Sequence, residues 1–171
     1  MSIVGHWIGF IISEFIRSNK FFDITEDITY FFVLIFIYKS VDNPSTLHHI
    51  VFNCALLWCV RLCAFVGYRV IVRGSDWRFD KLITERAYNL FGWTSGGTWC
   101  FFNGFCLWLL ADCVASASND LSTVHYVGMA VFAFGLLVES TSDIQKYRFN
   151  QAFKSDQNSN WIDTGLWAYS R

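Results

Sequence analysis

Long runs of apolar residues, separated by short polar segments, dominate the pattern along this chain. The longest uncharged run is Ala87–Ala111, and Leu121–Val138 and Asn43–Val60 are further runs of the same kind. Weaker runs cover Ile28–Tyr38 and Ile3–Ile16, the last interrupted by one acidic residue. A helix needs about 20 mostly apolar residues to cross a bilayer. The pattern therefore predicts five membrane-spanning helices, at 3–16, 22–38, 46–68, 88–111 and 121–139, followed by a tail over 140–171.

Helices are the natural choice for such runs, because backbone groups inside a bilayer have to form their hydrogen bonds within the chain. Strands with one solvated face would show alternating apolar and polar positions, and residues 31–37 do not alternate. We therefore predict an all-α, multi-span helical membrane protein with a single membrane domain over residues 1–171. The run at 3–16 lacks the basic start and the cleavage site of a secretory signal, so we interpret it as a membrane helix. A helix lying on the membrane surface is the alternative.

The composition agrees with a membrane protein and excludes several other classes. Hydrophobic residues make up 54% of the chain and charged residues only 16%, whereas soluble domains carry roughly 25% charged residues. Such a composition excludes intrinsic disorder, and the net charge of -1 gives no reason to expect a nucleic-acid partner. The six cysteines lie in apolar runs without C-x-x-C spacing, so we expect small buried side chains rather than disulfides or a metal site.

The distribution of basic residues predicts the orientation in the membrane. With five spans, the segments after the first, third and fifth helices lie on one side, and they hold 11 of the 13 basic residues. Positive residues mark the cytoplasmic side, so we expect an external or lumenal N-terminus and a cytoplasmic tail. Lys39 lies on the other side and Arg61 within a helix. The 11 residues are Arg17, Lys20, Arg69, Arg73, Arg78, Lys81, Arg86, Lys146, Arg148, Lys154 and Arg171.

Arg61 and the loop that follows it are the polar features that most need an explanation. A charge inside a membrane helix costs at least about 2.5 kcal/mol, so we expect a carboxylate, a water-filled cavity or a bound anion near Arg61. In the following loop, Arg69, Arg73 and Arg78 lie within ten residues, and the planar guanidinium group suits phosphate binding. Either feature has a structural alternative, which is ion pairing for Arg61 and control of topology for the loop.

The end of the fifth helix carries a second polar group. Glu139, Asp143 and Lys146 share one helix face through their spacing of three and four residues. They form either ion pairs at a helix end or the rim of a cofactor site. The adjacent pair His48 and His49 does not face one metal ion, because neighbouring positions diverge on a helix. The sequence contains no glycine-rich dinucleotide motif, P-loop or zinc-ligand motif.

Three stretches of the chain resemble the steroid 5-alpha reductase superfamily, in its uncharacterised multi-span membrane branch. They are Trp58–Phe79, Glu139–Phe149 and Gly165–Arg171. The first is similar to the branch's pattern of tryptophan, arginine-leucine, arginine, glycine, aspartate and arginine-phenylalanine. The resemblance covers the chain from about Asp23 to its last residue, Arg171. In the family a His-Pro-Asn-Tyr segment and further helices follow, so we expect this chain to be a fragment with impaired activity.

The resemblance implies a membrane oxidoreductase that uses NADPH to reduce a carbon–carbon double bond conjugated to a carbonyl in a sterol-like or other lipid. In this chemistry a hydride goes to the β-carbon and a proton to the α-carbon. The lipid substrate would enter from the bilayer, and NADPH from the cytoplasm. The family favours the endoplasmic reticulum. The oligomeric state stays open.

The resemblance also implies which residues form the site. Arg61 would face the reaction cavity, as the catalytic candidate, and no metal is expected. The arginines and lysines would bind phosphates, and Asp143 would accept a hydrogen bond from the carboxamide or ribose. The NADPH-binding candidates are Arg73, Asp76, Arg78, Asp143, Gln145, Lys146, Arg148, Trp167, Tyr169, Ser170 and Arg171.

The chain departs from the steroid reductases at Val60 and Arg61, where those enzymes carry a histidine-tyrosine pair, and this argues against a steroid as substrate. Two other functions stay open from sequence. One is a membrane methyltransferase of the isoprenylcysteine type, which bound S-adenosylmethionine would indicate. The other is a non-enzymatic integral membrane protein, in which the arginines only set topology. Replacing Arg78 and Lys146 by alanine would leave cofactor binding unchanged in that case.

Overall fold

The computed structural model describes residues 2–73, 84–113, 121–153 and 161–169. Within these ranges the chain forms five α-helices and one short 3-10 helix, with no strand. This confirms the prediction of an all-helical protein. The elements are α1 (Ser2–Ile16), α2 (Phe22–Lys39), α3 (Thr46–Arg73), α5 (Arg86–Cys113), α6 (Thr123–Phe153) and the 3-10 helix η2 (Gly165–Tyr169).

The helices follow the expected ranges, with one clear difference at the last one. We expected a tail from residue 140, but α6 continues without a break to Phe153. Residues 140–153 contain neither glycine nor proline, so nothing in the sequence stops the helix there. Helix α3 likewise continues past residue 68 to Arg73. The polar end of α6, with its candidate cofactor residues, is therefore helical.

Two helices begin with the same local arrangement. The backbone N–H of Ser45 donates to His48 Nδ1 at the start of α3 (3.1 Å), and that of Ser122 donates to His125 Nδ1 at the start of α6 (2.9 Å). The serine supplies the N-cap, and the histidine three residues later takes the place that glutamate holds in a capping box. These contacts give His48 and His125 structural roles.

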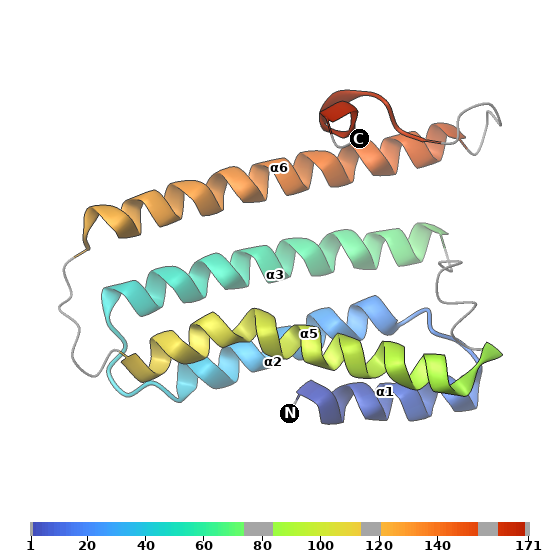
Figure 1. The fold of residues 1–171 in the computed structure, drawn as a ribbon, viewed down its shortest axis with the longest axis horizontal. Coiled ribbons are helices and arrows are strands. Elements are labelled where there is room, and N and C mark those ends of the chain that lie inside the picture. The colour runs from blue at the N-terminus through green and yellow to red at the C-terminus, as the bar shows by residue number, and fades with distance from the viewer. Residues whose placement is uncertain (1, 74–83, 114–120, 154–160, 170–171) are drawn as a thin grey trace. The chain divides into compact units, whose positions relative to one another are not determined.

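The chain divides into two compact units, Met1–Asp120 and Leu121–Arg171. In the first unit, α1, α2, α3 and α5 pack side by side, and each helix runs antiparallel to the one before it (Figure 1). Helix α2 lies at the centre, because it contacts α1, α3 and α5. Its side chains Tyr30, Leu34 and Ile37 are buried against Cys59 of α3 and Cys100 of α5.

Helices α1 and α5 approach each other closely because glycines lie between them. A Cβ atom at Gly97 would lie 3.0 Å from the Cα of Ile3, and one at Gly9 would lie 2.3 Å from the Trp93 ring. Only glycine fits at either position without a shift of the neighbouring chain. Small residues at such positions let helix backbones approach closely.

The outer faces of the helices are apolar. On α1 the exposed side chains include Ile8, Ile12 and Phe15, and on α6 they include Val131 and Phe134. Two helices among the described residues are long and apolar enough to cross a membrane, Thr46–Val72 with a mean hydropathy of 2.0 and Thr123–Gln151 with 1.4.

The other three helices do not meet the same criteria, for different reasons. Helix α1 is too short, with 15 residues. Helix α2 carries too many charges. Glycines and polar residues lower the hydropathy of α5. The expectation of five spans therefore stays a prediction.

Candidate functional site

Charged residues of α2 and α3 interact with one another in the first unit. Near the end of α3, the Arg69 guanidinium forms an ion pair with the carboxylate of Asp23 on α2. One helical turn further along α2, Asp27 is 5% exposed, and both Arg61 and Arg69 interact with its carboxylate electrostatically. The structure thus provides the carboxylate that Arg61 needs in an apolar helix.

Two cysteines form hydrogen bonds with the turn of α2 that carries Glu26 and Asp27. The Cys59 thiol of α3 donates to the backbone oxygen of Asp27 (3.6 Å), and the Cys100 thiol of α5 donates to that of Glu26 (3.4 Å). Both thiols are buried, as expected from sequence, and both are free. Cys106 differs, because it is exposed on α5. Packing of α3 and α5 against this turn of α2 fixes where Glu26 and Asp27 lie.

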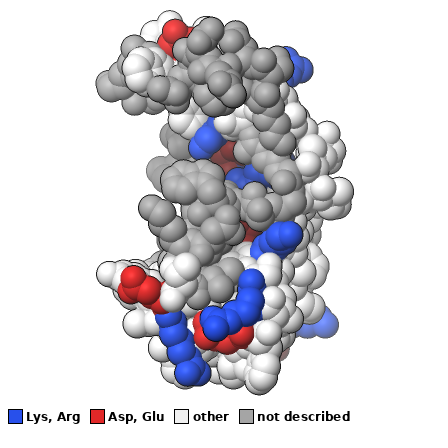
Figure 2. Space-filling view, turned by 90° about the vertical axis from the view of Figure 1, so that its right-hand side faces the viewer, with Lys and Arg blue, Asp and Glu red and all other residues white. Residues whose placement is uncertain are grey.

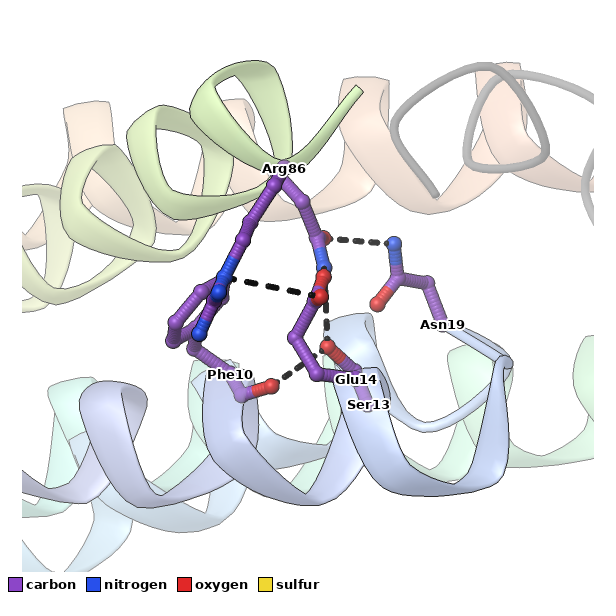
Figure 3. Close-up of polar contacts among 6 residues, drawn as sticks. Phe10, Ser13, Glu14, Asn19 and Arg86 are labelled. Atoms are coloured by element: carbon purple, nitrogen blue, oxygen red, sulfur yellow. Dashed lines mark hydrogen bonds and ion pairs between the residues drawn. The ribbon is translucent and has the colours of Figure 1, made fainter. Parts of the chain in front are cut away.

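A second polar network joins α1, the following link and α5 (Figure 3). The Asn89 amide donates to Ser13 Oγ (3.0 Å) and to Glu14 Oε1 (2.7 Å), and its oxygen accepts from the Asn19 amide (2.9 Å). Trp93 Nε1 donates to the Asn19 oxygen (3.1 Å). Asn89 is fully buried and hydrogen-bonded on both sides of its amide, so the network ties three segments together.

Charged residues gather at the end of the first unit where this network lies. Arg17 and Lys20 in the link between α1 and α2, and Arg86 at the start of α5, are exposed there. Figure 2 looks onto this end, and the Lys and Arg side chains lie beside Asp and Glu side chains in its lower half. Arg86 forms an ion pair with Glu14 (3.8 Å). Lys39 lies at the opposite end of α2, so the basic ends of α1, α3 and α5 coincide as the charge pattern predicts.

In the second unit, η2 folds back onto the polar end of α6. The Leu166 backbone N–H donates to Gln145 Oε1 (3.0 Å), and Trp167 Nε1 donates to the backbone oxygen of Ser142 (3.0 Å). The Lys146 ammonium lies 5.2 Å from the centre of the Trp167 ring, a cation–π contact. The structure therefore brings together three predicted site residues, Gln145, Lys146 and Trp167, from stretches about twenty residues apart.

Gly165 makes this return possible. Its φ of +63° is in the left-handed region, which residues with a Cβ adopt at a cost. A Cβ at this position would also lie 2.5 Å from Gln145 Oε1. The glycine therefore allows η2 to lie directly against the Gln145 side chain.

Of the remaining predicted site residues, three are described by the structure and five lie outside it, at least in their side chains. Asp143 is partly buried on α6, whereas Arg148 and Tyr169 are exposed, Tyr169 at 90%. Arg73 ends α3, but its side chain lies outside the described residues, as do Asp76, Arg78, Ser170 and Arg171. The prediction that the arginine loop and the end of α6 share one cofactor site therefore stays a prediction.

Sequence reasoning missed the acidic residues of α2 and the asparagine of α5. Asp23, Glu26 and Asp27 are spaced so that they share one side of the helix. Ionisable residues within an apolar helix are rare and mark functional sites. The spacing of these three acidic residues therefore indicates a polar site from sequence alone. The structure adds that Asp27 interacts with Arg61. The apolar residues that follow hide this signal, because they make the run resemble the start of a membrane span.

Chemically, the first unit offers Arg61 and the buried Asp27 between two helices, and these can orient a polar group of an apolar ligand by hydrogen bonding and charge. The second unit offers exposed cations beside an aromatic ring. Among the described residues no group of three or more histidine, cysteine or acidic side chains is arranged to hold a metal ion.

Comparison with known proteins gives one match. A family model described as "Protein of unknown function (DUF1295)" matches residues 9–171, nearly the whole chain. No curated protein and no solved structure matches the chain.

Proposed function

Since the chain belongs to the DUF1295 family, which is associated with the steroid 5-alpha reductase-like superfamily, we propose that it is an NADPH-dependent reductase of the membrane. In this proposal it reduces a carbon–carbon double bond conjugated to a carbonyl in a lipid. The observation that carries the proposal is the family match over residues 9–171.

The proposal treats all five helices as membrane spans. Helices α3 and α6 are long and apolar enough to cross alone. Helix α1 is apolar but short, and α2 and α5 carry more charged and polar residues. Helix α2 packs between its neighbours and α5 packs along α1, which buries polar side chains such as Asp27 and Asn89. Exposed side chains such as Ile11, Phe32 and Phe102 then face lipid. The basic end of the bundle lies in the cytoplasm, and we place the protein in the endoplasmic reticulum.

The polar end of α6 fits the chemistry of a dinucleotide. Lys146 and Arg148 are exposed cations that can bind phosphate groups. The Trp167 ring beside Lys146 provides an aromatic surface for a planar base. Gln145 holds η2 through Leu166, so its part is to position this segment. NADPH would supply the hydride when bound, and the chain's residues bind and orient it.

Arg61 and Asp27 would act on the lipid substrate. The guanidinium group, which interacts electrostatically with Asp27, can hydrogen-bond a carbonyl oxygen and stabilise the negative charge that develops there on reduction. Asp27 is buried, and a charge interaction in a buried place is stronger than one in water.

Cofactor binding tests the proposal directly. The 171-residue chain, reconstituted in phosphatidylcholine nanodiscs, is titrated with NADPH, NADH and S-adenosylmethionine. We expect weak NADPH binding, above the micromolar range, and a preference for NADPH over NADH. Lys146→Ala should weaken binding about tenfold, because a charged hydrogen bond is lost. Lys39→Ala removes a lysine that is not among the predicted cofactor residues, so it is the matched control and should bind NADPH as the wild type does.

The alternatives give different results. Binding of S-adenosylmethionine without NADPH would replace the reductase by a methyltransferase. No binding of NADPH at millimolar concentration would overturn the proposal. A micromolar dissociation constant would support the cofactor and contradict the expectation that the site in this chain is impaired.

A further inference from the structure

His6 on α1 is a fully buried side chain whose hydrogen bonding is only half explained. Its Nδ1 lies 2.8 Å from the backbone oxygen of Ser2, four residues earlier. A carbonyl oxygen only accepts, so Nδ1 carries the hydrogen and Nε2 of the neutral ring is an acceptor. Nε2 is buried and has no hydrogen-bond partner among the described residues. A buried polar atom of this kind needs a donor.

The Glu26 side chain of α2 and the His6 ring both lie near the backbone of Gly96 on α5. A Cβ atom at Gly96 of α5 would lie 3.0 Å from His6 Cδ2, the carbon next to Nε2, and 2.3 Å from Glu26 Oε1. The two side chains therefore converge on the α5 backbone from two different helices, where glycine leaves room for them. Glu26 is only partly buried, so the place can be reached from its side.

Among the charged side chains around Glu26, acidic groups outnumber basic ones. Asp23 and Asp27 lie next to Glu26 on α2, and Arg61 and Arg69 of α3 interact with Asp27. The thiols of Cys59 and Cys100 approach this turn of α2 as neutral groups. Three carboxyl groups thus stand beside two guanidinium groups, and His6 is the basic group on the α1 side.

We propose that His6 and Glu26 bind one water molecule between them at Gly96 and form a proton-holding site in the interior of the bundle. Water suits the two side chains, because it can donate one hydrogen to His6 Nε2 and the other to Glu26 Oε1. Buried water commonly satisfies such groups when two or more polar partners are present. The site exists whether or not the chain is a reductase.

The site also has a place in the proposed reaction, and this step rests on the proposed function. Reduction of the double bond adds a hydride to one carbon and a proton to its neighbour. Glu26 would hold this proton on Oε2 as a neutral carboxyl group, while its Oε1 accepts from the bound water. Transfer of the proton leaves a carboxylate, and a hydronium ion that enters from the side of Glu26 protonates it again. This would make the pair a proton supply for the reduction.

Nuclear magnetic resonance of histidine tests the water site without any assay of activity. The whole chain is labelled with ¹⁵N-histidine in phosphatidylcholine nanodiscs, and the His6→Gln variant assigns the His6 signals. We expect magnetisation transfer from water to the His6 ring and an Nε2 shift typical of a hydrogen-bonded acceptor. His48 and His125, whose Nδ1 atoms accept from serine, serve as internal references.

Gly96→Ala should remove the water contact, because the added methyl group displaces the Glu26 carboxyl. Gly67→Ala is the matched control, since a Cβ there meets nothing within 4 Å. If Gly96→Ala does not fold, Glu26→Met removes the acceptor while keeping the side-chain length, and it should remove the contact as well.

Three results would overturn the inference. They are a free Nε2 without water contact in the wild type, a direct hydrogen bond between His6 and Glu26, and a water contact that survives both Gly96→Ala and Glu26→Met. None of them affects the NADPH titration, so the failure of this site and the failure of the proposed function can be told apart.

Discussion

At the scale of single residues, the buried polar side chains of the first unit are matched by partners far away in the sequence. Arg61 faces Asp27, and Arg69 pairs with Asp23. Asn89 bonds to residues more than 65 positions earlier. An unpaired polar group in an apolar interior costs several kcal/mol, so each such side chain indicates a specific packing of the helices. Replacing Asn89 tests whether such a side chain stabilises the packing of the helices.

We predict that Asn89→Leu lowers the free energy of unfolding by about 2–3 kcal/mol, because the polar groups of Asn19 and Ser13 lose buried partners. Asn103→Leu is the control on the same helix. Asn103 is exposed and its amide donates to the Trp99 backbone oxygen of its own helix, so the change should stay within about 0.5 kcal/mol. Thermal unfolding in detergent measures both. Equal stability of the two variants would show that the network does not stabilise the bundle.

At the scale of elements, short local signals decide where helices start and how the last segment turns. Serine and histidine three residues apart start α3 and α6. The left-handed conformation of Gly165 turns η2 back onto α6. Because these signals act within a few residues, they are readable in the sequence once the arrangement is known.

We predict that Gly165→Ala detaches η2 from α6. The left-handed conformation costs a residue with a Cβ about 1–2 kcal/mol, and the added atom would overlap the Gln145 side chain. The Leu166 amide, which donates to Gln145, should then exchange its hydrogen with solvent at least about fivefold faster.

Gly135→Ala is the control for this change, since a Cβ there lies in open space on α6. It should leave the exchange rate of Leu166 as it is. An unchanged exchange rate of the Leu166 amide in Gly165→Ala would show that the contact of η2 with α6 does not depend on the glycine.

At the scale of the whole molecule, the first unit has a basic end and an end with few charges. The basic residues Arg17, Lys20 and Arg86 lie at one end, whereas Lys39 lies at the other. Because positive residues mark the cytoplasmic side of a membrane protein, we expect this asymmetry to orient the bundle. The network of Figure 3 lies at the basic end.

We predict that trypsin, added to sealed microsomes with the cytoplasmic face outward, cleaves the chain after Lys20 and Arg86. Cleavage after Lys39 should occur only once detergent opens the vesicles, so Lys39 is an internal control. Mass spectrometry of the peptides measures both. Cleavage after Lys39 in sealed vesicles, with protection of Arg86, would show that the orientation is the reverse of the predicted one.

The sequence by itself determined the helices. It also predicted that most basic residues lie at one end of the bundle, because they follow alternate helices. Apolar runs and the lack of breakers are local properties, so they predict helices without knowledge of the fold. Residues 140–153 are the exception: their polar sequence predicts a tail, whereas the structure continues α6 through them. The tertiary structure alone decided which side chains meet. Asp27 beside Arg61, Asn19 beside Asn89 and His6 beside Glu26 depend on how the helices pack and rotate about their axes. That packing is set by glycines and ring stacking across helices, which no local pattern specifies.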